Sequence, residues 1–121
     1  MTVTNEERRR RALAGVEWLR ANPGQWDQRY YTSVESGVRT FCWGGAVLHT
    51  QGYTNRGNTW VGVNGAGCLT DTLLEEVLGV STEIGIISRL LGYMPMVYTE
   101  AALDELERRV LTWLRQVEEK S

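Results

Sequence analysis

The sequence predicts an all-α domain of five to six helices, with one minor short β-hairpin or strand near residues 53–63. Apolar residues recur at helical spacing in several segments, and nearly all of these segments are followed closely by glycine or proline. The chain has 121 residues, of which 42% are hydrophobic and 23% charged. This length and composition are typical of one globular domain with its own core, so a single helical domain is expected over residues 1–121.

The first helix is expected over residues 5–21. Thr4, followed three residues later by Glu7, forms a capping-box pattern, which marks a helix start. Residues Asn22 to Gly24 end this helix and lead into a short second helix over residues 24–31. The apolar stripe of the first helix consists of Ala12, Leu13, Val16 and Leu19.

The middle of the chain holds the predicted central helix and the minor β element. Residues 32–38 are polar and contain a glycine, so they are predicted to form a loop. The central helix is expected over residues 40–51 and is closed by Gly52. Tryptophan and valine favour extended chain, so a short strand is expected over residues 59–63.

Three further helices complete the prediction, over residues 69–78, 82–91 and 100–119. The apolar positions of the last helix alternate steps of three and four, which is the pattern of a coiled-coil seam. In a monomer this seam would pack against the first helix, and in a homodimer it would pack against its own copy. The seam consists of Leu103, Leu106, Val110, Trp113 with Leu114, and Val117.

Charge and hydropathy exclude several classes of partner. The net charge of −2 argues against nucleic-acid binding by bulk electrostatics. No apolar run approaches the roughly 20 residues that span a bilayer, and the N-terminus lacks a secretory signal. No membrane partner is therefore predicted, and a cytoplasmic location is expected, where Cys42 and Cys68 are reduced. The four consecutive arginines at residues 8–11 point all round a helix, which favours a solvated face over a phosphate grip.

The stretch FCWGGAVLHTQG at residues 41–52 raises the question of thiol chemistry. Cys42 would lie in the first turn of its helix, where the thiolate is stabilised, and His49 is the only histidine. Seven residues place His49 about 10 Å along the helix axis, too far for a direct nucleophile–base hydrogen bond. Catalysis by this pair is therefore a weak alternative to close packing around the small residues 44–46. No cofactor or metal is predicted, because the paired short spacings of a zinc site are missing from the sequence.

Aromatic and arginine side chains near loops and short elements are the candidate binding residues. The chain contains five tryptophans and five tyrosines. Together with arginine, these residues form interface hot spots, and they also stack on nucleobases. The predicted binding surface consists of Trp26, Tyr30, Tyr31, Arg39, Trp43, Tyr53, Arg56 and Trp60.

Four stretches in combination resemble a family of small uncharacterised proteins encoded by actinobacteriophages. They are NEERRRRALAGVEWLRANPGQWDQ, RTFCWGGAVLHTQGYT, TWVGVNGAG and LLEEVLGV. The shared pattern is a helix ending in Asn-Pro, a Gln-Trp dipeptide and a Cys-aromatic-x-Gly-aliphatic core helix. The resemblance covers residues 5–80, and the last third departs from it. It implies a helical fold and a phage accessory gene, and it supplies no activity and no catalytic residues.

Two functions are expected from these observations. The first is a non-enzymatic phage accessory protein that binds a host or anti-phage-defence component in the cytoplasm of the infected bacterium. The alternative is a small-molecule binder that sequesters a nucleotide signal, with Arg39 or Arg56 on phosphate and a tryptophan on the base. A thiol enzyme at Cys42 is a third, less favoured, hypothesis.

Overall fold

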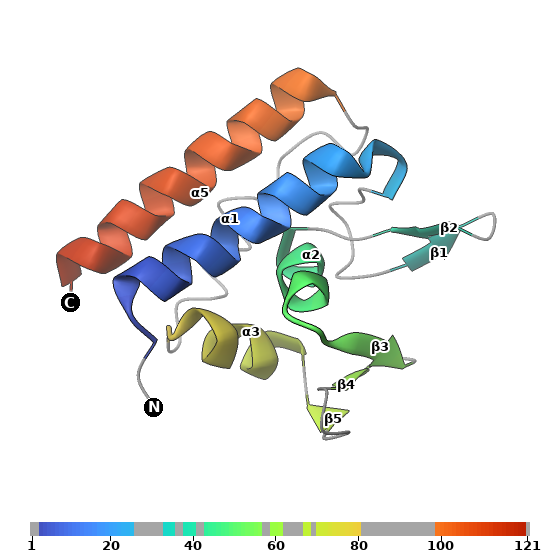
Figure 1. The fold of residues 1–121 in the computed structure, drawn as a ribbon, viewed down its shortest axis with the longest axis horizontal. Helices are drawn as coiled ribbons and strands as arrows, with labels where there is room; N and C mark the ends of the chain where they lie inside the picture. The colour runs from blue at the N-terminus through green and yellow to red at the C-terminus, as the bar shows by residue number, and fades with distance from the viewer. Residues whose placement is uncertain are drawn as a thin grey trace.

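The fold of the described residues is mostly helical, as the sequence predicts (Figure 1). Its α-helices in this part of the chain are α1 (Asn5–Ala21), α2 (Trp43–Thr50), α3 (Thr70–Leu78) and α5 (Glu100–Lys120), with a 3₁₀ turn η1 (Pro23–Gln25) after α1. The computed structural model describes residues 3–25, 33–35, 38–40, 43–56, 59–61, 67–68, 70–80 and 99–120.

Short strands accompany the helices in two antiparallel sheets. One sheet pairs β1 (Ser33–Glu35) with β2 (Val38–Thr40). The other has the order β3-β4-β5 and contains β3 (Thr54–Arg56), β4 (Thr59–Val61) and β5 (Gly67–Cys68). Strands β3 and β4 fall within the segment near 53–63 for which the sequence predicts a minor β element.

The largest difference from the predicted elements lies before α2. The predicted loop at 32–38 contains β1 and the start of β2, and the predicted helix start at Thr40 is instead the end of β2, opposite Ser33. Helix α2 begins at Trp43. The physical reason is that β-branched residues lie on both sides of a Ser-Gly dipeptide at 36–37, a hairpin signal that the polar composition masked.

The ends of the other helices follow local capping chemistry. In α1, the Thr4 hydroxyl accepts a hydrogen bond from the Glu7 backbone N–H at 3.1 Å, and the predicted span is confirmed. Helices α2 and α3 end at glycines with positive φ, 91° at Gly52 and 65° at Gly79. Both ends carry the long hydrogen bond of a Schellman cap, from Tyr53 N–H to the Leu48 carbonyl and from Val80 N–H to the Glu75 carbonyl. The predicted helix 24–31 is described only in its first residues, and the helix 82–91 lies outside the described residues.

Helix α1 is the centre of the helical layer, because it contacts α2, α3 and α5. Helices α1 and α5 run side by side in opposite directions (Figure 1), so that Arg9 meets Glu118 at one end and Arg20 meets Asp104 at the other. The seam of α5 is used within the chain, since its members Leu103, Leu106, Val110, Trp113 and Leu114 are all buried in the core. These five residues therefore pack within the chain, as expected for the seam of a monomer, and the homodimer through residues 100–119 stays a prediction.

Helices α1 and α2 approach each other closely in the core. A Cβ atom placed on Gly15 would lie 2.6 Å from Cγ2 of Val47 and 3.1 Å from the Val47 backbone nitrogen. Val47 is fully buried, and its β-branched side chain has little rotameric freedom. Only glycine at position 15 therefore permits the two backbones to come this close.

We predict that Gly15→Ala destabilises the protein. Alanine would gain about 1 kcal/mol of helix propensity, but forcing apart a packed contact costs about 1–3 kcal/mol, so a net loss of about 1–2 kcal/mol is expected in the free energy of unfolding. The measurement is chemical denaturation followed by circular dichroism. Gly24→Ala is the matched control, because no atom lies within 4 Å of its added Cβ, and its expected change is within about 0.5 kcal/mol. A Gly15→Ala variant as stable as the wild type would contradict the close-packing argument.

Candidate functional site

The predicted binding residues fall into three groups. Trp26, Tyr30 and Tyr31 lie outside the described residues, as does Cys42. Backbone pairing places three others: Arg39 lies in β2 opposite Val34, Arg56 in β3 opposite Thr59, and Trp60 in β4 opposite Asn55. Arg56 and Trp60 are thus on neighbouring strands without facing each other directly. The side chains of Trp43 and Tyr53 are described.

Trp43 lies in the core and not on a binding surface, which corrects the sequence-based assignment. Its side chain is 3% exposed. The indole Nε1–H donates a hydrogen bond to the Ala12 carbonyl of α1 at 3.0 Å. The ring also makes an edge-to-face contact with Trp113 of α5, with 6.1 Å between ring centroids. Trp43 of α2 therefore contacts both α1 and α5 in the core. Its apolar ring is buried, and its polar N–H group has a hydrogen-bond acceptor.

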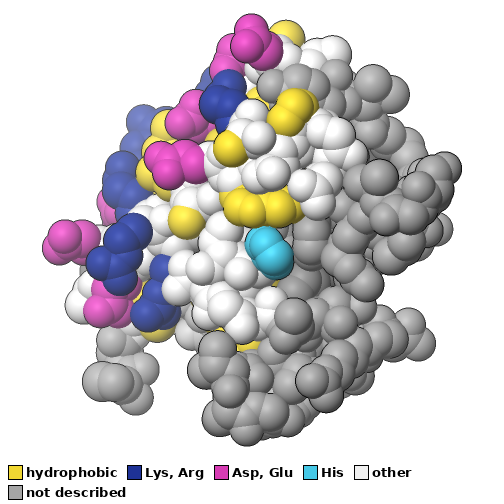
Figure 2. All heavy atoms as spheres, turned by 45° about the vertical axis from the view of Figure 1, so that its right-hand side comes forward, with side chains coloured by type: hydrophobic (Ala, Val, Ile, Leu, Met, Phe, Trp, Pro, Cys, Tyr) yellow, Lys and Arg dark blue, Asp and Glu magenta, His cyan; other side chains and the backbone are white. Residues whose placement is uncertain are grey.

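The other end of α2 is on the surface. His49 is exposed, and its ring meets the Trp18 indole edge-on, with centroids 4.9 Å apart and an interplanar angle of 65°. Trp18 and Tyr53 are both partly buried and packed against the core. Figure 2 shows the His49 ring on the surface beside a hydrophobic side chain, away from most of the charged side chains of this view. Trp18 and His49 form an aromatic pair on the surface, and the partly buried Tyr53 follows His49 four residues later in the chain. We call these three residues the aromatic surface.

Sequence analysis missed Trp18 as a surface residue because it lies at the margin of the helical stripe. Its neighbours Val16 and Leu19 are buried, which makes a core assignment natural. A large ring at such a margin can place one face in the core and leave the other accessible. The detectable signal was therefore the position of Trp18 at the edge of the stripe, not its residue type.

The thiol hypothesis gains no support from the described residues. Cys42 precedes α2 and lies outside them, so its distance to His49 stays a prediction. The His49 ring contacts the Trp18 indole. Within the described ranges, no group of three or more histidine, cysteine, aspartate or glutamate side chains could hold a metal ion.

The arginine block at residues 8–11 is divided among different structural roles. Arg8 is 5% exposed, and its guanidinium closes the C-terminal end of α3. Its Nε donates to the Leu78 carbonyl at 2.6 Å, and its terminal nitrogens donate to the Gly79 carbonyl at 3.3 Å and to the Asn5 side-chain oxygen at 2.7 Å. A cation at this position satisfies helix-end carbonyls and faces the negative end of the helix dipole.

The remaining three arginines confirm that the block is not one basic surface. Arg11 donates to the Val77 carbonyl of α3 at 2.8 Å, and Arg9 pairs with Glu118 of α5 at 3.0 Å. Arg10 is exposed. The solvated-face interpretation of the block is therefore wrong for Arg8, which is buried because the carbonyls at the end of α3 need donors.

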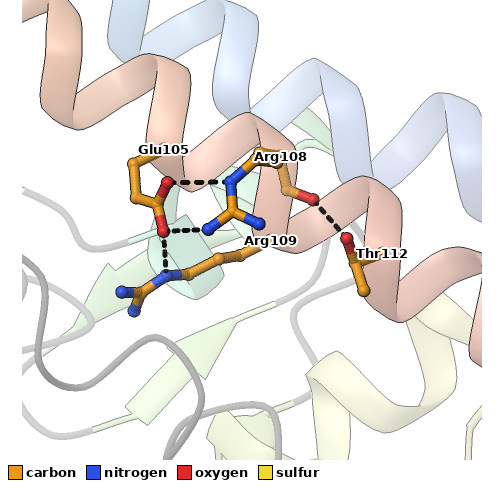
Figure 3. Close-up of polar contacts among 4 residues, drawn as sticks. All are labelled: Glu105, Arg108, Arg109 and Thr112. Atoms are coloured by element: carbon orange, nitrogen blue, oxygen red, sulfur yellow. Dashed lines mark hydrogen bonds and ion pairs between the residues drawn. The ribbon is translucent and has the colours of Figure 1, made fainter.

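The outer surface of α5 carries a second cluster of arginines. Glu105 accepts hydrogen bonds from Arg108 and Arg109, and Thr112 donates from its hydroxyl to the Arg108 carbonyl (Figure 3). The hydrogen bonds from Arg108 and Arg109 lower the pKa of the Glu105 carboxyl to about 2. Beside this cluster, a shallow groove of about 320 Å³ is lined by Arg9, Arg108, Leu111, Thr112 and Arg115. We call it the α1–α5 groove.

No protein-family model, curated protein or solved structure matches this chain. Among the helices in the described part of the chain, none has the length and hydrophobicity of a membrane-spanning segment.

We predict that Arg8→Ala lowers the free energy of unfolding by about 2–3 kcal/mol, because it leaves the buried carbonyls at the end of α3 without a charged donor. Arg10→Ala is the control, since Arg10 is exposed on the same helix, and its expected change is within about 0.5 kcal/mol. Urea denaturation of both variants measures the difference. Equal stability of the two variants would show that the guanidinium of Arg8 does not hold α3.

We also predict that Glu105 titrates well below an ordinary glutamate. Because its folded-state pKa is lowered from 4.5 to about 2, the stabilisation from its ionised form is present above pH 4.5 and is lost as the pH falls toward 2. Carbon-detected NMR titration of the Glu105 carboxyl measures the pKa directly. Arg108→Ala should raise it toward the ordinary value. A wild-type pKa near 4.5 would mean that these hydrogen bonds do not persist in solution.

Proposed function

We propose that this protein is a non-enzymatic binding protein that recognises a host or anti-phage-defence component. In keeping with the sequence resemblance, it would be a phage accessory protein acting in the cytoplasm of the infected bacterium. The observation that supports this proposal best is the aromatic surface of Trp18, His49 and Tyr53, which lies where α1 and α2 meet.

This surface has the properties of a binding anchor. Aromatic side chains offer a large contact area and have few rotatable bonds, so they lose little entropy on binding. Trp18 and Tyr53 are further restrained because part of each packs against the core. The edge contact with Trp18 orients the His49 ring at the surface. The three residues would therefore meet a partner in a pre-organised arrangement, which reduces the free-energy cost of association.

The aromatic surface continues into the segment in which the sequence predicts binding residues. Tyr53 directly precedes β3, which contains Arg56, and β3 pairs with β4, which contains Trp60. The backbone hydrogen bond from Tyr53 N–H to the Leu48 carbonyl, at 3.1 Å, attaches the start of β3 to the end of α2. In this proposal, residues 53–60 extend the binding surface that begins at Trp18.

The test is affinity capture from an actinobacterial lysate, prepared with and without phage infection and analysed by native mass spectrometry. We expect wild-type protein to capture a specific host protein. His49→Ala should reduce the amount captured about tenfold, since the loss of one well-placed anchor costs ~1.4 kcal/mol. Glu76→Ala is the control, because Glu76 is exposed on α3.

Two results would contradict the proposal. One is capture of no specific protein from either lysate. The other is equal capture by wild type and His49→Ala, which would place binding elsewhere on the protein. A co-purifying mass of a few hundred daltons, lost on the same substitution, would instead favour the nucleotide-sequestering alternative.

A further inference from the structure

We infer that the α1–α5 groove binds an acidic segment of a partner protein in which an apolar side chain lies between carboxylates. The inference rests on the proposed function, because it requires a protein partner. It adds a second contact surface, which is cationic. It concerns residues that the aromatic surface does not include.

The lining of the groove is cationic and contains no acidic residue. Its three arginines come from two helices: Arg9 from α1, and Arg108 and Arg115 from α5. Arg115 is exposed, and no described residue forms a hydrogen bond or ion pair with its guanidinium. A surface with this composition is electrostatically complementary to carboxylates, and such complementarity steers association and selects partners.

The other two arginines are held in place and still have free donors. Arg9 donates through one terminal nitrogen to both Glu118 oxygens, at 3.0 and 3.3 Å. Arg108 uses Nε and one terminal nitrogen for Glu105 (Figure 3). A guanidinium has five N–H donors. Each of these two arginines can therefore donate hydrogen bonds to a second carboxylate and keep those to its present glutamate. Their side chains are 43% and 67% exposed, so these donors are accessible.

The groove lining also contains two uncharged side chains, which lie between Arg108 and Arg115 in the sequence of α5. Leu111 is partly buried and packs against the core. The Thr112 hydroxyl donates to the Arg108 carbonyl at 2.9 Å, so its one O–H donor is already used within α5 (Figure 3). A volume of about 320 Å³ is at the small end of ligand sites, roughly 300–1,000 Å³, and suits one large side chain with its flanking groups.

This combination of uncharged side chains and arginines in one lining favours a peptide over other anions. Inorganic phosphate and a phosphodiester backbone have no apolar group to place on Leu111. The residues that line the groove include no aromatic platform for a nucleobase. Because a guanidinium plane can also stack on a base, single-stranded DNA is included in the experiment below. In an acidic segment, a leucine or similar side chain can contact Leu111 while the glutamates or aspartates on either side of it bind the arginines.

The experiment measures binding of a labelled synthetic peptide to the full chain by fluorescence polarisation at an ionic strength of about 0.15 M, where the Debye length is about 8 Å. The probe has one leucine flanked on each side by two glutamates. We expect Arg115→Glu to weaken binding about tenfold or more, because it replaces an attraction by a repulsion. Arg10→Glu makes the same change in net charge outside the groove lining, and its expected effect is less than about twofold, since separated surface charges are screened. Replacing the leucine of the peptide by serine should also weaken binding.

Several outcomes would overturn the inference. One is that the peptide does not bind the protein at all. The others are that Arg10→Glu and Arg115→Glu weaken peptide binding equally, or that the leucine and serine peptides bind with equal affinity. Tighter binding of single-stranded DNA of the same charge, also lost in Arg115→Glu, would assign the groove to nucleic acid instead. His49→Ala should leave peptide binding unchanged, so failure of the peptide test would contradict only the inference about the groove. Failure of the His49 capture test would contradict the binding role of the aromatic surface and the proposed function.

Discussion

The close crossing of α1 and α2 at Gly15 and Val47 is the contact on which the rest of the structure depends. Because position 15 has no Cβ, the two backbones approach closely enough for Trp43, at the start of α2, to donate its indole N–H to the Ala12 carbonyl. The same ring then reaches Trp113 of α5. One end of α2 is thereby fixed in the core, and the other end carries His49 to the surface. The small residues 44–46 of α2 are buried, and the small residue at the crossing itself is Gly15 of α1.

Helix α3 is held by a different kind of interaction. Its last carbonyls receive guanidinium donors from Arg8 and Arg11 of α1. A buried cation that has no carboxylate partner among the described residues is tolerable here, because several carbonyl dipoles at a helix end replace part of its hydration. The charges of Arg8 and Arg11 are therefore structural. Arg10 of the same block is exposed, and Arg9 lines the joint surface of α1 and α5 together with Arg108 and Arg115.

Sequence patterns predicted what depends on local chemistry and missed what depends on distant neighbours. The cap at Thr4, the glycines at 52 and 79 and the seam of α5 are local signals, and the helices they bound were found within a few residues. The burial of Arg8 could not be found this way, because its partner Leu78 is 70 residues away. Trp43 was misassigned for the same reason: a tryptophan near a predicted loop suits an interface as well as a core, and only the position of Ala12 decides between them.

The two surfaces are geometrically independent because of the pitch of α1. Arg9 and Trp18 are nine residues apart, which is two and a half turns at 3.6 residues per turn, so they leave the helix on opposite sides. The rise between them is about 14 Å. Arg9 accordingly faces Glu118 of α5, and Trp18 faces His49 of α2. A short partner segment can occupy one surface without touching the other, so their contributions to binding should add. A partner that uses both must wrap around α1 or present two separate segments.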